Sequence, residues 1–203
     1  MKSNGSRLPT LLIIGFLALA FIPPRAPNVS WAEDAEAEKA EFTGVKKCKM
    51  CHKSEKQGEQ FRIWTESKHS HAYETLGTPE AAEVAKAQGI KGNPQEAKEC
   101  LRCHATAYEM TAEELASSKM TMEEGVSCES CHGAGSLYQS KKTMKALTAG
   151  EIEPASVGLL DPGEKTCIQC HNEESPNFPG FDYVKMYAKI AHPVPAPAEG
   201  AEK

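Results

Sequence analysis

Apolar side chains recur along this chain with the spacing of amphipathic helices, and runs that alternate with a period of two are absent. Residues 55–76 carry Phe61, Trp64 and His69 with few helix breakers, and Gly77 ends that stretch. The pattern predicts few strands and a mainly α, loop-rich fold.

Capping residues predict three more helical segments. Thr78-Pro79 starts a helix that runs to about Gln88, because the hydroxyl caps the first turn and proline suits its first position. Thr111 to Glu114 has the spacing of a capping box. Asp182 is expected to cap a helix over residues 183–191.

The longest apolar run, residues 8–22 (LPTLLIIGFLALAFI), lies near the N-terminus. Positive residues precede it, two prolines follow it, and Ser30-Trp31-Ala32 offers small residues to a signal peptidase. At about fifteen residues it is shorter than the roughly 20 of a spanning helix, which favours a cleaved signal peptide over a retained anchor. Residues 1–32 are therefore predicted to be a signal peptide, and the mature protein to be periplasmic without a membrane span.

Composition divides the rest of the chain into a charged flexible leader at residues 33–42, a folded domain at residues 43–192 and a disordered Pro/Ala-rich tail at residues 193–203. Aromatic residues make up 6% of the chain, which also has 15 Gly and 13 Pro. Such a polypeptide alone would build a thin core, and small chains of this kind usually rely on metals or covalent staples.

The chain is acidic, with 23 Lys and Arg against 28 Asp and Glu, a formal net charge of -5. Residues 1–32 hold three of the positive charges and no acid, so cleavage leaves 20 against 28, or −8. This balance argues against a nucleic-acid partner and favours a basic surface on a redox partner, although solvated proteins without a charged partner are often acidic too.

Four segments share the pattern Cys-x-x-Cys-His and together contain all eight cysteines. They are Cys48-Lys49-Met50-Cys51-His52, Cys100-Leu101-Arg102-Cys103-His104, Cys128-Glu129-Ser130-Cys131-His132 and Cys167-Ile168-Gln169-Cys170-His171. Paired cysteines also occur in zinc sites, disulfide frameworks and thioredoxin-like redox pairs. Zinc needs no histidine directly after the second cysteine, disulfides would not repeat this pattern four times, and a redox pair would be single.

The pattern is the attachment signature of haem c. Two thiols about one helical turn apart can add to the two vinyl groups on one porphyrin edge, and the next residue projects an imidazole toward the iron. We therefore predict four covalent haems that form the core, with proximal ligands from His52, His104, His132 and His171. The residues between the cysteines follow no pattern, as expected if only their number matters.

The first cysteines of successive motifs lie 52, 28 and 39 residues apart. This uneven spacing argues against tandem repetition of one haem module and favours a single tetrahaem domain over residues 43–192.

Four irons have eight axial positions, but the chain has only seven histidines. Besides the proximal ones these are His69, His71 and His192, so at least one iron lacks a second histidine. We predict His69, on a helix after Trp64, and His192, at the end of the last helix, as distal ligands. His71 would face another direction on that helix. Thioether is the other usual sixth ligand, and Met144 is the candidate, with ordinary helix packing as the alternative.

Blocks of sequence around these motifs resemble the tetrahaem cytochrome c-554 family, from about Phe42 to His192. The matching blocks are Gly44-Val45-Lys46-Lys47, Trp64 and His69 with Glu74-Thr75-Leu76, Gly125-Val126-Ser127 through Gly133, and Phe181-Asp182 through His192. The resemblance implies a mostly helical fold with haems in close, partly stacked pairs.

The same resemblance implies axial ligands. His69 and His192 match the family's distal ligands for the third and fourth haems, and the haem on His104 matches the family's five-coordinate iron. The family's distal ligand for the first haem is a histidine ten residues after the third motif, where this chain has Lys142. Met144, His71 or no residue then takes that place, and in the last case two irons are open.

The leading functional hypothesis is electron transfer between donor and acceptor redox proteins, because four haems in 203 − 32 = 171 residues must lie close together. The alternative is an enzyme that reduces nitric oxide or a related nitrogen oxide at the open iron on His104, since such catalysis needs a vacant position. A third hypothesis is a subunit of a larger haem assembly.

Overall fold

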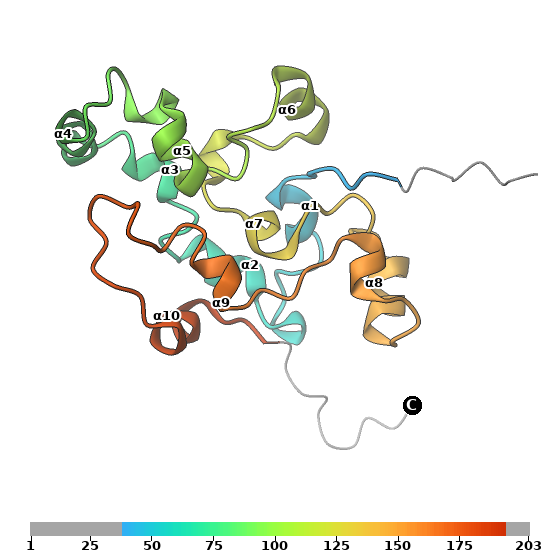
Figure 1. Cartoon of the computed structure of the whole chain (residues 1–203). Helices are drawn as coiled ribbons and strands as arrows, with labels where there is room; N and C mark the ends of the chain where they lie inside the picture. The colour runs from blue at the N-terminus through green and yellow to red at the C-terminus, as the bar shows by residue number, and fades with distance from the viewer. Residues whose placement is uncertain (1–37, 194–203) are drawn as a thin grey trace, which may run out of the picture. The chain divides into compact units, whose positions relative to one another are not determined.

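The computed structural model of the chain describes residues 38–193. Within that range the regular elements are helices and short 3-10 turns, and no strand occurs, which confirms the predicted mainly α class (Figure 1). The predicted signal peptide at residues 1–32, residues 33–37 of the leader and residues 194–203 of the tail lie outside the described residues.

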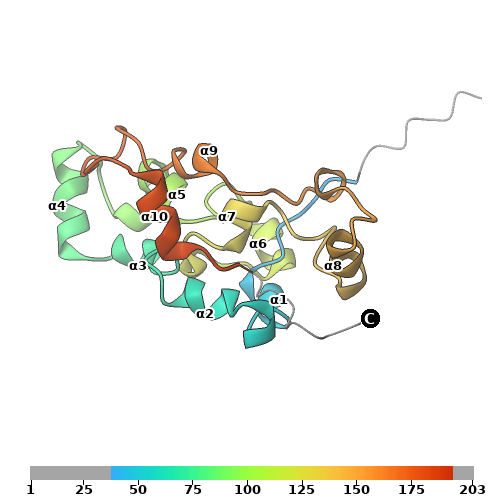
Figure 2. The same cartoon turned by 90° about the horizontal axis from the view of Figure 1, so that it is seen from below.

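Ten α-helices occur in the described range, most of them short. They are α1 (Val45–Lys49), α2 (Gln60–Thr65), α3 (Ala72–Thr75), α4 (Pro79–Ala87), α5 (Lys98–His104), α6 (Ala112–Ser118), α7 (Cys128–His132), α8 (Lys141–Thr148), α9 (Glu164–Cys167) and α10 (Tyr183–Ile190). The 3-10 turns are η1 (Glu55–Gln57), η2 (Pro94–Glu96), η3 (Met122–Glu124) and η4 (Pro154–Val157). Loops join these elements, and Figure 2 gives the perpendicular view.

The capping residues begin helices where the sequence predicts them. The Thr78 hydroxyl accepts a hydrogen bond from the backbone N–H of Ala81 at the start of α4, at 3.2 Å. Both hydrogen bonds of the predicted capping box are present at α6. The Asp182 carboxylate accepts from the backbone N–H of Lys185 at 3.1 Å, and α10 follows.

The prediction of one long helical stretch over residues 55–76 is wrong. The segment is divided into η1, α2 and α3, and His69 lies in the turn between α2 and α3 instead of on a helix. The Ser70 hydroxyl donates to the carbonyls of Thr65 and Ser67, at 2.9 Å each, and the Ser67 hydroxyl donates to the carbonyl of Trp64 at 2.7 Å. Serine hydroxyls that bind the backbone in this way compete with the helical pattern.

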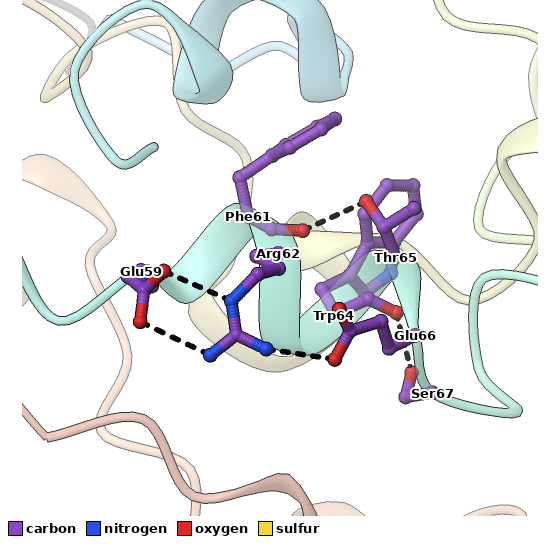
Figure 3. A network of polar contacts seen from close by, with 7 residues as sticks. All are labelled: Glu59, Phe61, Arg62, Trp64, Thr65, Glu66 and Ser67. Carbon is purple, nitrogen blue, oxygen red and sulfur yellow. Dashed lines mark hydrogen bonds and ion pairs between the residues drawn. The ribbon is translucent and has the colours of Figure 1, made fainter. Parts of the chain in front are cut away.

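The α2 helix is held by contacts on both of its sides. On the exposed side Arg62 forms ion pairs with Glu59 and Glu66, at 2.9 and 2.8 Å (Figure 3). On the other side the indole N–H of Trp64 donates to the carbonyl of Val126 at 2.9 Å. Exposed ion pairs contribute little to stability, so the indole contact is the one that ties α2 to the segment before the third motif.

The hydrophobic core of the described residues is small. Its main cluster consists of Leu76, Leu101 and Ala105, with Tyr73 and Met122 among the partly buried side chains packed against it. Apart from this cluster, five other hydrophobic residues are buried: Val45, Ala85, Ala107, Met120 and Tyr138. This is a thin core for a domain of this length, as composition predicts, and it fits a fold whose apolar mass comes in part from a cofactor.

None of the helices in the described part of the chain is long and apolar enough to cross a membrane.

Candidate haem-binding site

Each Cys-x-x-Cys-His motif forms a helical turn. The second motif occupies the C-terminal part of α5, and α7 runs from the first cysteine to the histidine of the third motif. In the first motif the backbone N–H of His52 donates to the carbonyl of Cys48 at 3.0 Å, and in the fourth His171 donates to Cys167 at 3.0 Å. A helical turn brings both cysteines and the histidine to one side of the backbone, which is the arrangement that covalent attachment requires.

The cysteines of different motifs lie next to one another as free thiols. The thiol of Cys48 in the first motif is hydrogen-bonded to that of Cys128 in the third, which lowers the pKa of Cys48 and raises that of Cys128. Burial, together with the neighbouring thiol of Cys103 in the second motif, raises the pKa of Cys170 in the fourth to about 12. The first and third motifs are therefore neighbours, and so are the second and fourth.

A third pair of neighbouring thiols links these two pairs of motifs. Burial raises the pKa of Cys131 in the third motif, and the nearby thiol of Cys167 in the fourth raises it further. The third motif is thus near the fourth as well as the first.

The residues between the cysteines do more than set a spacing, so the expectation that only their number matters is wrong. The Ser130 hydroxyl is hydrogen-bonded to that of Thr106 at 2.5 Å, which joins the third motif to the loop after the second. Arg102 forms an ion pair with Glu174 at 2.7 Å, which joins the second motif to the turn after the fourth.

Glu129, also between two cysteines, joins the third motif to the first. Its side chain is buried, with 3% of the residue exposed. Its carboxylate accepts hydrogen bonds from the backbone N–H groups of Thr43, Gly44 and Gly135, at 2.9, 2.9 and 2.7 Å. Backbone donors at the start of α1 would otherwise be unpaired, so this carboxylate satisfies them while it holds the two motifs together.

A second buried carboxylate, that of Glu124, also binds the backbone at the start of α1. Glu124 accepts from the backbone N–H of Val45, the first residue of α1, at 3.0 Å. Burial is the main cause that raises its pKa, the Val45 N–H lowers it, and the charge of Glu129 raises it. Neither glutamate could be identified from the sequence, because each acts on a segment about 80 residues away in the chain.

Two pairs of imidazoles face each other, and each pair combines a motif histidine with a predicted distal one. The ring centres of His69 and His171 are 6.0 Å apart, and those of His132 and His192 are 5.9 Å apart. A metal held between two imidazoles has bonds of about 2 Å, which with the ~1 Å from each nitrogen to its ring centre separates the centres by about 6 Å. Both pairs fit a metal ion with two axial histidines.

Backbone contacts leave the other nitrogen of several imidazoles free for a metal. The Nδ1 atoms of His132 and His192 lie 3.3 and 2.8 Å from the carbonyls of Leu160 and Ile190. A carbonyl only accepts, so each Nδ1 carries the proton and donates it, and Nε2 keeps its lone pair. Such second contacts orient metal-bound histidines.

His104 and His171 are oriented in different ways. The Nδ1 atom of His104 donates to the carbonyl of Ala72 at 2.8 Å. The imidazole of His171 instead stacks on the Phe181 ring, with centres 4.8 Å apart and an angle of 16° between planes.

The remaining candidates are not brought together. Among residues 38–193, which include all seven histidines, neither His52 nor His104 has another imidazole ring in contact. The Nδ1 atom of His71 pairs with the Glu74 carboxylate at 3.0 Å on the surface, where 59% of the His71 side chain is exposed. Met144 is half-buried on α8, and its role as a ligand stays a prediction.

Two glycines beside the third motif allow close approach of other segments. A Cβ atom at Gly125 would lie 2.6 Å from the carbonyl oxygen of His69, and one at Gly133 would lie 2.4 Å from that of Gly158. Both glycines have positive φ angles, 62° and 79°. The backbone of His69 therefore lies directly against the segment that leads into the third motif.

Comparison with known proteins identifies similar chains. A family model described as cytochrome c554 and c-prime matches residues 47–133. Cytochrome c-554 of Nitrosomonas europaea is 31% identical over 145 residues, which cover 66% of this chain and 59% of that protein. The chain thus matches somewhat less than two thirds of the length of this relative.

A solved structure, that of cytochrome c554 from Nitrosomonas europaea in its reduced state, is similar with a TM-score of 0.47 and 24% identity, and the match covers 76% of this chain and 79% of that one. The resemblance predicted from the sequence is confirmed by the family model and the sequence relative. Residues 47–133 thus match the cytochrome c554 and c-prime family, whose members carry covalently attached haem c.

Proposed function

We propose that this protein is an exported tetrahaem c-type cytochrome that carries electrons between redox proteins in the periplasm. The observation that carries the proposal is two pairs of adjacent imidazoles, one pair at the third attachment motif and one at the fourth. When bound, haem supplies an iron that gains and loses one electron, and a second axial histidine leaves no position on that iron for a substrate. Such sites suit electron transfer.

The proposed ligand assignment follows the contacts. The eight motif cysteines attach the haems, and His52, His104, His132 and His171 are the proximal ligands. The order of the distal histidines along the chain is the reverse of the order of their partners. His69 faces the histidine of the fourth motif, and His192 faces that of the third. His52 and His104 then hold the two irons without a second histidine, and Met144 remains the candidate for the first.

The adjacency of the thiols bears on electron transfer between haems. Cys48 lies beside Cys128, Cys131 is close to Cys167, and Cys103 is beside Cys170. We infer that haems on neighbouring motifs exchange electrons with one another.

The test uses holoprotein matured in a periplasm that attaches haem c. We expect four haems per chain, reduction of all four by a redox protein, and oxidation by a second redox protein, with negligible turnover of small molecules. A reduced holoprotein that transferred electrons to no cytochrome or quinone-linked protein would contradict the proposal.

A second candidate function is favoured by one observation, namely that no imidazole of the described chain faces His104. An iron there would have an open position, where nitric oxide or a related nitrogen oxide would be reduced. Steady-state assays with nitric oxide, hydroxylamine and nitrite separate this activity from simple carriage, and rates no higher than those of free haem would eliminate it. Light scattering across a concentration series tests the remaining alternative, a subunit of a larger haem assembly.

A further inference from the structure

Lysines are concentrated around the first motif. Lys46, Lys47 and Lys49 lie on α1, Lys53 follows the motif, and Lys56 lies on η1. All five are exposed, and none is in an ion pair among residues 38–193. We call these five residues, with Met50 at their centre, the lysine face.

Helical geometry separates this face from the cofactor side of α1. Successive residues are about 100° apart around a helix, so Cys48, Cys51 and His52 share one side. Lys46 and Met50 fall on the opposite side, and 66% of Met50 is exposed. A haem attached to the first motif would therefore leave Lys46 and Met50 uncovered, with only the thickness of one helix, about 10 Å, between them and the porphyrin.

One lysine of the face is held in place. The Nζ atom of Lys49 lies 4.9 Å from the centre of the Phe61 ring on α2, a cation–π contact that orients the side chain at little cost. The lysine face thus joins an exposed apolar centre to a rim of positive charge beside the first attachment motif. Charged rims of this kind steer redox partners and set their orientation.

We propose that the lysine face is the docking surface for an acidic redox protein, which exchanges electrons with the haem on the first motif. This inference rests on the proposed function. It also refines the expectation from net charge, because an acidic chain predicts a basic partner whereas the local charge at this motif is positive. The partner that docks here is selected by the local field rather than by the net charge of the whole chain.

The first test depends on the sign of the charge where electrons leave the protein. Oxidation of the reduced holoprotein by anionic hexacyanoferrate(III) is followed by stopped flow as ionic strength is raised. If electrons leave at the lysine face, the rate falls as salt screens the attraction. If they leave elsewhere on this acidic protein, the rate rises or stays constant, and the proposal is overturned.

Two matched triple variants test whether these lysines cause the attraction of the anionic oxidant. The triple variant Lys46→Gln, Lys47→Gln, Lys53→Gln is compared with Lys86→Gln, Lys91→Gln, Lys98→Gln, which removes the same three charges from exposed lysines around α4, η2 and the start of α5. We expect the first triple to slow the low-salt rate about tenfold and the second less than about twofold. Equal effects would overturn the proposal, with haem content and circular dichroism as folding controls.

Binding is measured separately from electron transfer. Hexacyanochromate(III) is redox-inert and paramagnetic, so it broadens amide resonances near its binding site on labelled holoprotein. Broadening is expected at residues 46–56 and is expected to be lost in the first triple variant; broadening centred elsewhere overturns the proposal. Sedimentation of the holoprotein with phosphatidylglycerol vesicles, lost in that variant, would assign the face to a membrane surface and would also overturn it.

The two proposals fail in distinguishable ways. If hexacyanochromate(III) maps to the lysine face but no redox protein exchanges electrons with the holoprotein, the proposed function is wrong. If electron exchange with redox proteins is normal in the first triple variant, only the docking surface is wrong.

Discussion

The buried carboxylate of Glu129 accepts a hydrogen bond from the backbone N–H of Gly44 at 2.9 Å, across 85 residues of sequence. Glu129 lies inside the third attachment motif, and Gly44 is the residue before α1, which carries the first. The thiols of these two motifs are neighbours. The motifs are also joined by a hydrogen bond from the peptide N–H group before α1 to the side chain of Glu129 on α7. This contact keeps the proposed first and third haem sites adjacent.

Substitution of Glu129 by alanine is expected to destabilise the fold. The change leaves the N–H groups of Thr43, Gly44 and Gly135 without a partner, which costs roughly 3 kcal/mol or more in the free energy of unfolding. Guanidinium unfolding followed by circular dichroism measures it. Glu123→Ala, at an exposed acid nearby, is the control and should change stability by less than about 0.5 kcal/mol. Similar effects for the two variants would contradict the proposed role.

The pH dependence of stability tests the buried acid Glu124. Its pKa is raised, mainly by burial, with Lys46 lowering it and Glu123 and Glu129 raising it. The folded state thus retains this proton to a higher pH than the unfolded chain does. The contribution of protonated Glu124 to the stability of the fold is present below the ordinary pKa of about 4.5 and is lost as pH rises through the raised value.

Glu124→Gln removes that titration but keeps an oxygen to accept from Val45. We expect the variant to gain thermal stability relative to the wild type as pH increases from 4 to 7. Because other groups titrate in both proteins, the quantity to measure is the difference between their melting temperatures at each pH. A difference that is constant, or that decreases with pH, would be incompatible with a raised pKa.

Electron paramagnetic resonance of the oxidised holoprotein tests the imidazole pairs. His69→Ala and His192→Ala should each convert one low-spin haem to high spin, because each removes one of two facing imidazoles. His71→Ala is the control, since this side chain pairs with Glu74 on the surface, and should leave the spectrum unchanged. Four low-spin bis-histidine signals in the wild type would contradict the count of seven histidines.

Gly125→Ala tests the approach of the His69 backbone to the third motif. The added Cβ would meet the His69 carbonyl at 2.6 Å in addition to the strain of a positive φ. Gly89→Ala also places a side chain at a positive φ, 72°, but meets nothing within 4 Å. Gly89→Ala should cost about 1 kcal/mol in the free energy of unfolding. Gly125→Ala should cost more and also raise the high-spin signal, whereas equal costs would show that the close contact is unimportant.

Much of the local structure could be predicted from the sequence, because its causes are local. Thr78 and Asp182 begin helices through contacts made within three residues. The segment around His69 was mispredicted because two serines bind backbone carbonyls there and end the helix early. Periodicity records which side chains are apolar, but it does not record this competition for backbone hydrogen bonds.

The partners of the histidines could be predicted only in part. Counting axial positions identified His69 and His192 as ligand candidates, and each lies opposite a motif histidine. The choice of partner depends on how distant segments fold together, and the fold places His69 opposite His171 and His192 opposite His132. No spacing in the sequence encodes that choice.

By itself the sequence predicted the attachment chemistry, since two thiols and an imidazole within five residues have the spacing that one porphyrin requires. Which motifs adjoin, the imidazole pairing and the carboxylate bridge from Glu129 to Gly44 were decided only by the tertiary structure. The physical reason is the length of the loops. Hydrogen bonds and contacts between residues 60 or more positions apart become favourable only once the whole chain has closed those loops.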